Sequence, residues 1–357
     1  MKGVFYRSIG SAASVIGAVI GAGFITGAEI VRFFSGTFLL PACAALFVTL
    51  TVFFTVISYL GMRYGGLTGL NLRVFGRFSK IINASVLICS FITLAGMCAG
   101  ADALFSSASG IDERIPALSA VFLAISLFVC EKGIDGVSRF NLLLVPVMIT
   151  AIVAACAGSV SVKTVFTGES KIFSVVVYAS MNCFLSAAVI ADTGKGNSPF
   201  SVVIASVLAA FAISVCAYIV MNKISSSASL KKNIPLLSSV ESGFFKAVFF
   251  TVTLAGIITT LVSSHYPLVA LVKKSPVKRT LNAVFAVSAL ALSRLGFYKI
   301  VNKLYPVIGV VGLFYVLSLS LFALKESFFP DGKFFRKGYE RVHSRCEKTK
   351  HQRGGVN

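Results

Sequence analysis

Residues 17–29 read Gly17-Ala18-Val19-Ile20-Gly21-Ala22-Gly23-Phe24-Ile25-Thr26-Gly27-Ala28-Glu29 and lie in the first long apolar segment of the chain. Each glycine inside a helix costs about 1 kcal/mol relative to alanine, so this stretch is poorly suited to a continuous helix. One interpretation is a span interrupted at Gly21-Ala22-Gly23. The other is tight packing, because Gly17 and Gly21 have the spacing of small residues at helix interfaces.

Glu29 follows the last of these glycines within the same apolar segment. An ionisable residue at membrane depth costs several kcal/mol and is a functional-site hypothesis by default. Arg32, three residues further on, would lie on the same face of a helix and could pair with it. The sequence allows both a structural ion pair and a carboxylate that binds a proton, a substrate or an ion in a cavity.

The composition predicts an all-α integral membrane protein. The 357 residues are 56% hydrophobic and only 13% charged, whereas a soluble domain usually carries about 25% charge. A membrane-spanning helix needs roughly 20 apolar residues, and runs of that length recur from Ile9 to Leu324. The boundaries of these runs predict about ten transmembrane helices: 8–34, 38–62, 80–107, 115–131, 136–157, 171–191, 198–221, 243–271, 280–294 and 300–324.

One transmembrane domain is expected over residues 1–329, followed by a basic, disordered cytoplasmic tail over residues 330–357. The net charge of +20 falls largely in short loops, such as the one between Arg63 and Lys80, and in this tail. That distribution follows the positive-inside rule and predicts a multi-pass protein of the cell inner (plasma) membrane with both termini in the cytoplasm. We therefore expect the lipid bilayer as partner, with anionic lipid at the tail, and no nucleic acid.

The sequence contains no set of residues typical of an enzyme. Its eight cysteines form no Cys-x-x-Cys pair, which argues against a metal centre or redox site. No nucleophile elbow, phosphate-binding loop or metal-spaced His/Asp cluster is present. We therefore expect a non-enzyme without an organic cofactor.

An interrupted first span would place unpaired backbone groups inside the membrane. Such groups are tolerated only where they line a cavity or are buried in protein, and transporters use half-helix ends in this way to bind solutes and ions near the midplane. Gly21, Ala22, Gly23, Phe24 and Glu29 are therefore predicted to bind substrate.

The segment from Val19 to Ile30, followed by Phe33-Phe34, resembles the opening signature of the YkvI-type bacterial membrane proteins. Tyr305-Pro306-Val307-Ile308-Gly309-Val310-Val311-Gly312-Leu313 resembles the last span of that family, although Ala28 departs from its usual Gln or Arg. These proteins are similar to distant members of the amino acid–polyamine–organocation superfamily, which have the LeuT-type fold. The resemblance implies two inverted five-helix repeats, about 8–157 and 171–324, with discontinuous first and sixth helices.

This fold implies a partner break in the sixth span, where Tyr178 and Asn182 are the candidate substrate-binding residues and Asn182 is the candidate break. The alternative for Asn182 is a hydrogen bond to a neighbouring helix. In the sodium-coupled relatives, adjacent hydroxyl residues of the eighth span join carbonyls of the first around the ion. Thr259 and Thr260 match that pattern, which implies a sodium site with the carbonyls of Gly17 and Ile20. The alternative is that these hydroxyls bond to their own helix.

The leading hypothesis is a secondary active transporter that moves an amino acid or related amine or carboxylate by ion-coupled alternating access. Sodium at Thr259 and Thr260, or a proton at Glu29, would supply the coupling. A passive channel and a non-transporting membrane sensor or assembly protein remain as alternatives. Asp102 and His265 are interpreted as interfacial residues, and Asp192 as the end of a helix.

Overall fold

The structure is a computed structural model that describes residues 2–34, 37–110, 112, 115–156, 172–225, 243–270, 275–296 and 304–328. The predicted tail at residues 330–357, with its expected lipid contacts, lies outside these residues. All regular secondary structure in the described ranges is helical. The elements are α1 (Lys2–Val19), α2 (Ala22–Ile25), α3 (Ala28–Phe34), α4 (Leu39–Tyr64), α5 (Leu67–Phe75), η1 (Gly76–Phe78), α6 (Ser79–Ser109), α7 (Ala117–Glu131), α8 (Gly133–Cys156), α9 (Ile172–Leu185), α10 (Ala187–Thr193), α11 (Pro199–Ser225), α12 (Gly243–Ala270), α13 (Ser275–Ser293) and α15 (Tyr305–Phe328).

Each predicted segment is helical in the described part of the chain, which confirms the all-α membrane class. By length and composition, six helical runs there could cross a membrane, and the bent pair of α9 and α10 would make a seventh. Shorter apolar helices occupy the predicted fourth and ninth segments. The new elements are α5 and η1, which lie where the sequence predicts only a loop. The six runs are Leu39–Tyr64, Leu67–Ser109, Gly133–Cys156, Pro199–Ile224, Lys246–Ala270 and Tyr305–Ser327.

Large apolar side chains cover the outside of the bundle. Leu40, Leu143 and Phe314 are each 70% exposed or more, and many other exposed Phe, Leu and Val side chains accompany them. Water would penalise so extensive an apolar exterior, because burial of apolar surface is worth about 25 cal/mol per Å². Hydrocarbon imposes no such penalty, so the exterior suits a bilayer.

The first span is broken at the predicted place. α1 ends at Val19, one helical turn follows as α2, and α3 begins only at Ala28. Gly21 is extended, with φ −107° and ψ −167°. Gly27 has a φ of 78°, a left-handed conformation that glycine adopts without the clash of a Cβ atom.

The sixth span is also discontinuous, but the predicted position of its break is wrong. α9 and α10 meet at Ser186 with a bend of 65°, one turn after Asn182. Asn182 lies within α9, and its amide Nδ2 donates to the carbonyl of Tyr178, 3.0 Å away and four residues earlier. Its side chain therefore hydrogen-bonds to its own helix, whereas the alternative was a bond to a neighbouring helix.

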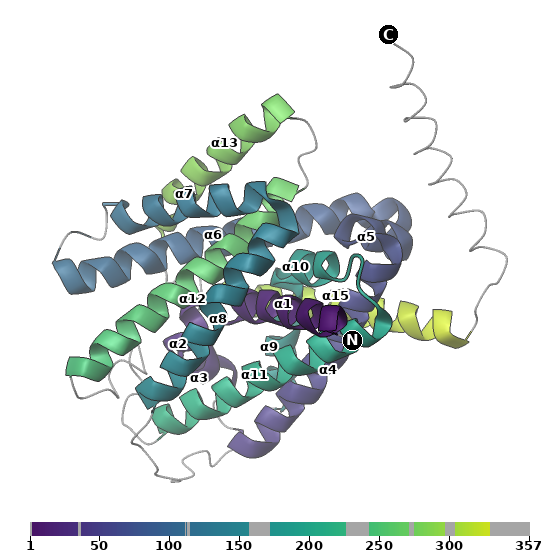
Figure 1. Cartoon of the computed structure of the whole chain (residues 1–357), viewed down its shortest axis with the longest axis horizontal. Helices are drawn as coiled ribbons and strands as arrows, with labels where there is room; N and C mark the ends of the chain where they lie inside the picture. Colours follow the sequence, from purple (N-terminus) through teal and green to yellow (C-terminus); the bar gives the residue numbers. More distant parts are fainter. Residues whose placement is uncertain are drawn as a thin grey trace.

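The first span crosses the middle of the molecule (Figure 1). α1 contacts α8, α10, α11 and α12, while α12 also packs against α6, α7 and α8. The sixth span is held by α15 and α4, which contact α9, and by α4 again at α10. Both broken spans are thus enclosed by long helices, as unpaired backbone groups in a membrane require.

Candidate functional site

Glu29 lies in the interior at the break of the first span. Its side chain is only 4% exposed, and its Oε2 accepts a hydrogen bond of 3.4 Å from the hydroxyl of Tyr178. A Cβ atom on Gly23 would overlap the carboxylate of Glu29. Glycine at position 23 therefore leaves the space in which the carboxylate lies against the turn of α2.

The proposed structural ion pair between Glu29 and Arg32 is not formed. Arg32 is exposed whereas Glu29 is buried, and no ion pair involves Glu29 within the described ranges. Burying an ionised carboxylate without a cation is costly. The site therefore calls for a proton or another cation at Glu29.

Tyr178 and Asn182 bring the sixth span to the same place. The fully buried ring of Tyr178 packs against the rings of Phe33 and Phe34, with centroids 5.3 and 5.5 Å away. These aromatic contacts fix the hydroxyl that donates to Glu29. Asn182 is 4% exposed and lies one turn further along α9.

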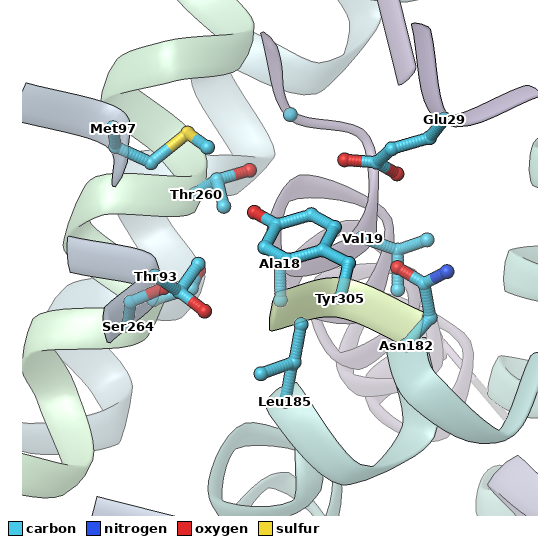
Figure 2. A pocket seen from close by; sticks show the side chains of 12 residues that line it. Ala18, Val19, Glu29, Thr93, Met97, Asn182, Leu185, Thr260, Ser264 and Tyr305 are labelled. Atoms are coloured by element: carbon cyan, nitrogen blue, oxygen red, sulfur yellow. The ribbon is translucent and has the colours of Figure 1, made fainter. Parts of the chain in front are cut away.

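A small central cavity lies between the two broken spans and α12. Its volume of about 10 Å³ is close to the minimum for one water molecule. In Figure 2, Glu29 and Asn182 point toward it from one side and Thr260 and Ser264 lie on the other, with the ring of Tyr305 between them. The lining residues are Ala18, Val19, Gly21, Glu29, Thr93, Met97, Asn182, Leu185, Thr260, Ser263, Ser264 and Tyr305.

Only some of the predicted substrate-binding residues lie together at the cavity. Gly21, Glu29 and Asn182 line the cavity, whereas Ala22, Gly23 and Phe24 form the buried turn behind it. Thr93 and Tyr305 were missed. Thr93 carries no signal in the sequence, because a single threonine in an apolar helix is common, and Tyr305 drew attention only through its resemblance to the family's last span.

Two of the four predicted sodium ligands are in contact between α1 and α12, and a third, Ile20, lies near α12. The hydroxyl of Thr260 donates to the carbonyl of Gly17 at 3.2 Å. The carbonyl of Ile20 lies 3.3 Å from the point that a Cβ atom on Gly256 would occupy, so it also faces α12. These neutral oxygens are of the kind that hard cations bind.

Thr259 is oriented differently from Thr260. Its hydroxyl is 3.0 Å from the carbonyl of Ala255 and 3.1 Å from that of Gly256, so it bonds to its own helix. Adjacent residues on a helix point about 100° apart, and here only Thr260 lines the cavity.

A second, larger cavity opens on the side of the molecule that carries the N-terminus. It measures about 680 Å³ and is lined by α1, by the start of α8 and by the segment joining α10 to α11. Asp192 lies at its edge, where its carboxylate accepts bonds from the hydroxyl of Tyr266 at 2.5 Å and the amide of Leu67 at 3.0 Å. We call this cavity the vestibule, and its polar lining includes Arg7, Ser11, Asp135, Ser138, Arg139 and Lys195.

Asp102 and His265, which the sequence suggests are interfacial, are both buried between helices. Asp102 is 5% exposed and accepts hydrogen bonds from the amide and hydroxyl of Ser119, at 2.9 and 2.5 Å, so it caps the first turn of α7. His265 is fully buried and its Nδ1 lies 2.8 Å from the hydroxyl of Ser126. Both side chains connect neighbouring helices.

The chain is similar to YkvI, an uncharacterized membrane protein of Bacillus subtilis. The two are 25% identical over 340 residues, which cover 88% of this chain and 96% of YkvI. This similarity confirms the resemblance found in the sequence. No family model matches the chain.

Three solved structures share the fold. MhsT in complex with L-phenylalanine is 16% identical, with a TM-score of 0.63, and the match covers 86% of this chain and 87% of MhsT. A Na⁺-coupled sialic acid symporter is 12% identical, with a TM-score of 0.60 and coverage of 88% and 79%. A manganese transporter of Eremococcus coleocola is 10% identical, with a TM-score of 0.58 and coverage of 90% and 79%. The chain therefore has the LeuT-type fold.

Proposed function

We propose that this chain is a secondary active transporter that moves a small amine-bearing solute, such as an amino acid, by ion-coupled alternating access. The observation that carries the proposal is the meeting of two discontinuous spans at one buried polar cavity, with Glu29 from the first and Asn182 from the sixth. Half-helix ends around a midplane site are the binding device of transporters with inverted repeats. The three structurally similar proteins bind different solutes, namely an amino acid, sialic acid and manganese. The class of solute is therefore inferred from the residues of this site.

The charge of the cavity favours an amine as the group that binds at Glu29. The carboxylate of Glu29 lies against Gly23, at the turn that the sequence predicts to bind substrate. A second carboxylate at that end would be repelled, whereas an ammonium group would provide the missing counter-charge. Tyr178 and Asn182 supply a hydroxyl and an amide beside it.

The two cavities support alternating access. The central cavity of about 10 Å³ is too small for an amino acid, while the vestibule of about 680 Å³ is open on the N-terminal side. A solute therefore requires a rearrangement around the broken spans before it can bind, as the rocking of one bundle against another would provide. We take the N-terminal side to be the cytoplasm, on the basis of the Lys and Arg distribution.

Coupling would come from a cation that favours the same conformation as the solute, so that each raises the affinity of the other. The oxygens of Gly17, Ile20 and Thr260 support sodium between α1 and α12. A proton carried by Glu29 is the alternative coupling ion. Sodium coupling would make transport depend on the sodium gradient, whereas proton coupling would make it depend on the pH gradient.

The test is uptake of radiolabelled amines and amino acids into proteoliposomes with an imposed sodium or proton gradient. The proposal predicts accumulation above the external concentration that collapses when the gradient is removed. Flux that equilibrates regardless of the gradient would indicate a passive channel instead. Absence of flux, together with loss of cellular function on truncation after Phe329, would indicate a sensor or assembly protein.

Glu29→Gln should weaken amine binding by about 30-fold or more, since removing one partner of a buried charge pair costs about 2–5 kcal/mol. Glu131→Gln is the matched control, because Glu131 is exposed at the end of α7. Isothermal calorimetry or scintillation proximity binding measures both. Equal solute affinities in the two variants would show that Glu29 does not bind the solute.

A further inference from the structure

The amide of Asn141 is buried with one of its two polar atoms unpaired. Asn141 lies in α8 and is fully buried. Its Nδ2 lies 3.3 Å from the carbonyl of Ser14 and 3.3 Å from the hydroxyl of Ser263. Its Oδ1 has no hydrogen-bond partner among the residues that the structure describes. A buried acceptor left unsatisfied costs about 1–3 kcal/mol and therefore calls for an explanation.

The orientation of this amide is set by its neighbours. The carbonyl of Ser14 can only accept a hydrogen bond, so the atom that faces it has to be the donor Nδ2. Oδ1 is then the atom that remains without a partner. Rotating the amide by half a turn would place Oδ1 against the carbonyl oxygen of Ser14, and these two acceptors cannot form a hydrogen bond.

Asn141 also lies directly against the first span. A Cβ atom on Gly17 would come within 2.7 Å of Cγ and 2.9 Å of Oδ1 of Asn141. The carbonyl of Gly17 accepts the bond from Thr260. Asn141 of α8 and Thr260 of α12 therefore both approach Gly17 of α1, where the lack of a side chain allows the close approach of Asn141.

We propose that Oδ1 of Asn141 is a ligand of the coupling cation, completing a site with the Gly17 carbonyl and the hydroxyls of Thr260 and Ser263. This proposal rests on the cation coupling proposed above and deepens it, because it adds a third helix to the site. It also replaces Thr259 by Ser263 as the second hydroxyl of α12. Ser263 lines the central cavity, whereas the hydroxyl of Thr259 bonds to its own helix.

The chemistry of these four oxygens selects the class of ion. All of them are neutral, and sodium accepts neutral carbonyl and hydroxyl oxygens, as hard cations do. A divalent ion usually requires carboxylates, and the four oxygens include none. The site is therefore assigned to a monovalent hard cation.

A line of polar groups joins this site to the vestibule. Ser138 lines the vestibule, and its hydroxyl lies 2.7 Å from that of Ser14. The carbonyl of Ser14 contacts Asn141, which contacts Ser263 at the central cavity. The hydroxyls of Ser14 and Ser138 thus link the cation site to the vestibule.

The experiment is a sodium titration of purified protein in detergent without solute, read by thermal shift and by ²²Na⁺ binding, with choline replacing sodium at constant ionic strength. Asn141→Ala should raise the sodium concentration at half-saturation by about tenfold or more, in the range seen when groups that support a metal site are removed. Ser263→Ala should do the same, and Thr259→Ala should leave it within about twofold.

Asn71→Ala is the matched control, because Asn71 is also a fully buried amide but pairs with Asn83 and Tyr315 far from the site. It should be destabilised without any change in the sodium midpoint. An unchanged midpoint in Asn141→Ala, or no sodium-specific response in the wild type, would overturn the proposal. If Asn141→Ala does not fold, an unchanged sodium midpoint in Ser263→Ala would overturn it as well. Gradient-driven uptake in proteoliposomes tests the transporter proposal separately and can succeed with a proton gradient when this site fails.

Discussion

Replacing Gly17 by alanine tests the contact on which both the closed packing of the first span and the cation site depend. Gly17 lies inside α1, so alanine should gain about 1 kcal/mol of helix propensity. The new Cβ atom would lie 2.7 Å from Cγ and 2.9 Å from Nδ2 and Oδ1 of Asn141. Carbon atoms in contact prefer about 3.5–4.0 Å, so the amide or the helix has to move by roughly 1 Å.

The expected magnitude follows from a matched control in the same helix. A Cβ atom on Gly10 would meet nothing within 4 Å, so Gly10→Ala should show the gain in propensity alone. Overpacking of a filled interior costs about 1–3 kcal/mol. We therefore expect Gly17→Ala to be less stable than Gly10→Ala by about 1–3 kcal/mol, and to bind sodium more weakly because the amide of Asn141 is displaced.

The measurement is unfolding in mixed detergent micelles with increasing SDS, followed by far-ultraviolet circular dichroism. Asn141→Ala should relieve the strain of Gly17→Ala, so the double variant should be more stable than the sum of the two single changes predicts. Additive effects, or equal stability of Gly17→Ala and Gly10→Ala, would refute the contact and with it the placement of Asn141 against the first span.

Two further variants test the polar contacts between helices. Asp102→Ala should lower stability by about 1–2 kcal/mol, because the amide and hydroxyl of Ser119 lose their cap; the same SDS titration measures the loss, and a change below the experimental error would exclude the cap. Tyr266→Phe should cost about 1.5–3 kcal/mol, the usual worth of a hydrogen bond to a charged group such as Asp192. Thermal unfolding with a dye that reacts with buried cysteines as they become exposed reports this loss, and a Phe variant as stable as the wild type would show that Asp192 is held by its other partners alone.

Much of the fold was predictable because the membrane imposes local rules. Segments of roughly 20 apolar residues have to be helical in hydrocarbon, and each predicted segment is helical in the described residues. The break of the first span was also predictable from Gly21 and Gly23. The break of the sixth was misplaced because no glycine or proline marks it, and the bend occurs at Ser186, whose residue type gives no such signal.

The site was predictable only where a residue type is unusual for the stretch of sequence around it. Glu29 stands out as an ionisable residue in an apolar segment, and it does line the cavity. Asn141 gave no comparable signal, because an asparagine in an apolar helix is usually bonded to a neighbour. Only its unpaired oxygen distinguishes it, and that depends on the atoms around it.

By itself, the sequence determined that the chain is a multi-spanning helical protein and that its first span cannot run unbroken through Gly21-Ala22-Gly23. Both properties follow from local energetics, namely the transfer of apolar side chains and the helix propensity of glycine. Only the tertiary structure decided that Glu29 lies apart from Arg32, that Thr260 rather than Thr259 reaches Gly17, and that α8 brings Asn141 to the same point. These outcomes depend on the direction of each side chain around its helix axis and on contacts between residues more than a hundred positions apart, which hydropathy and spacing along the chain do not encode.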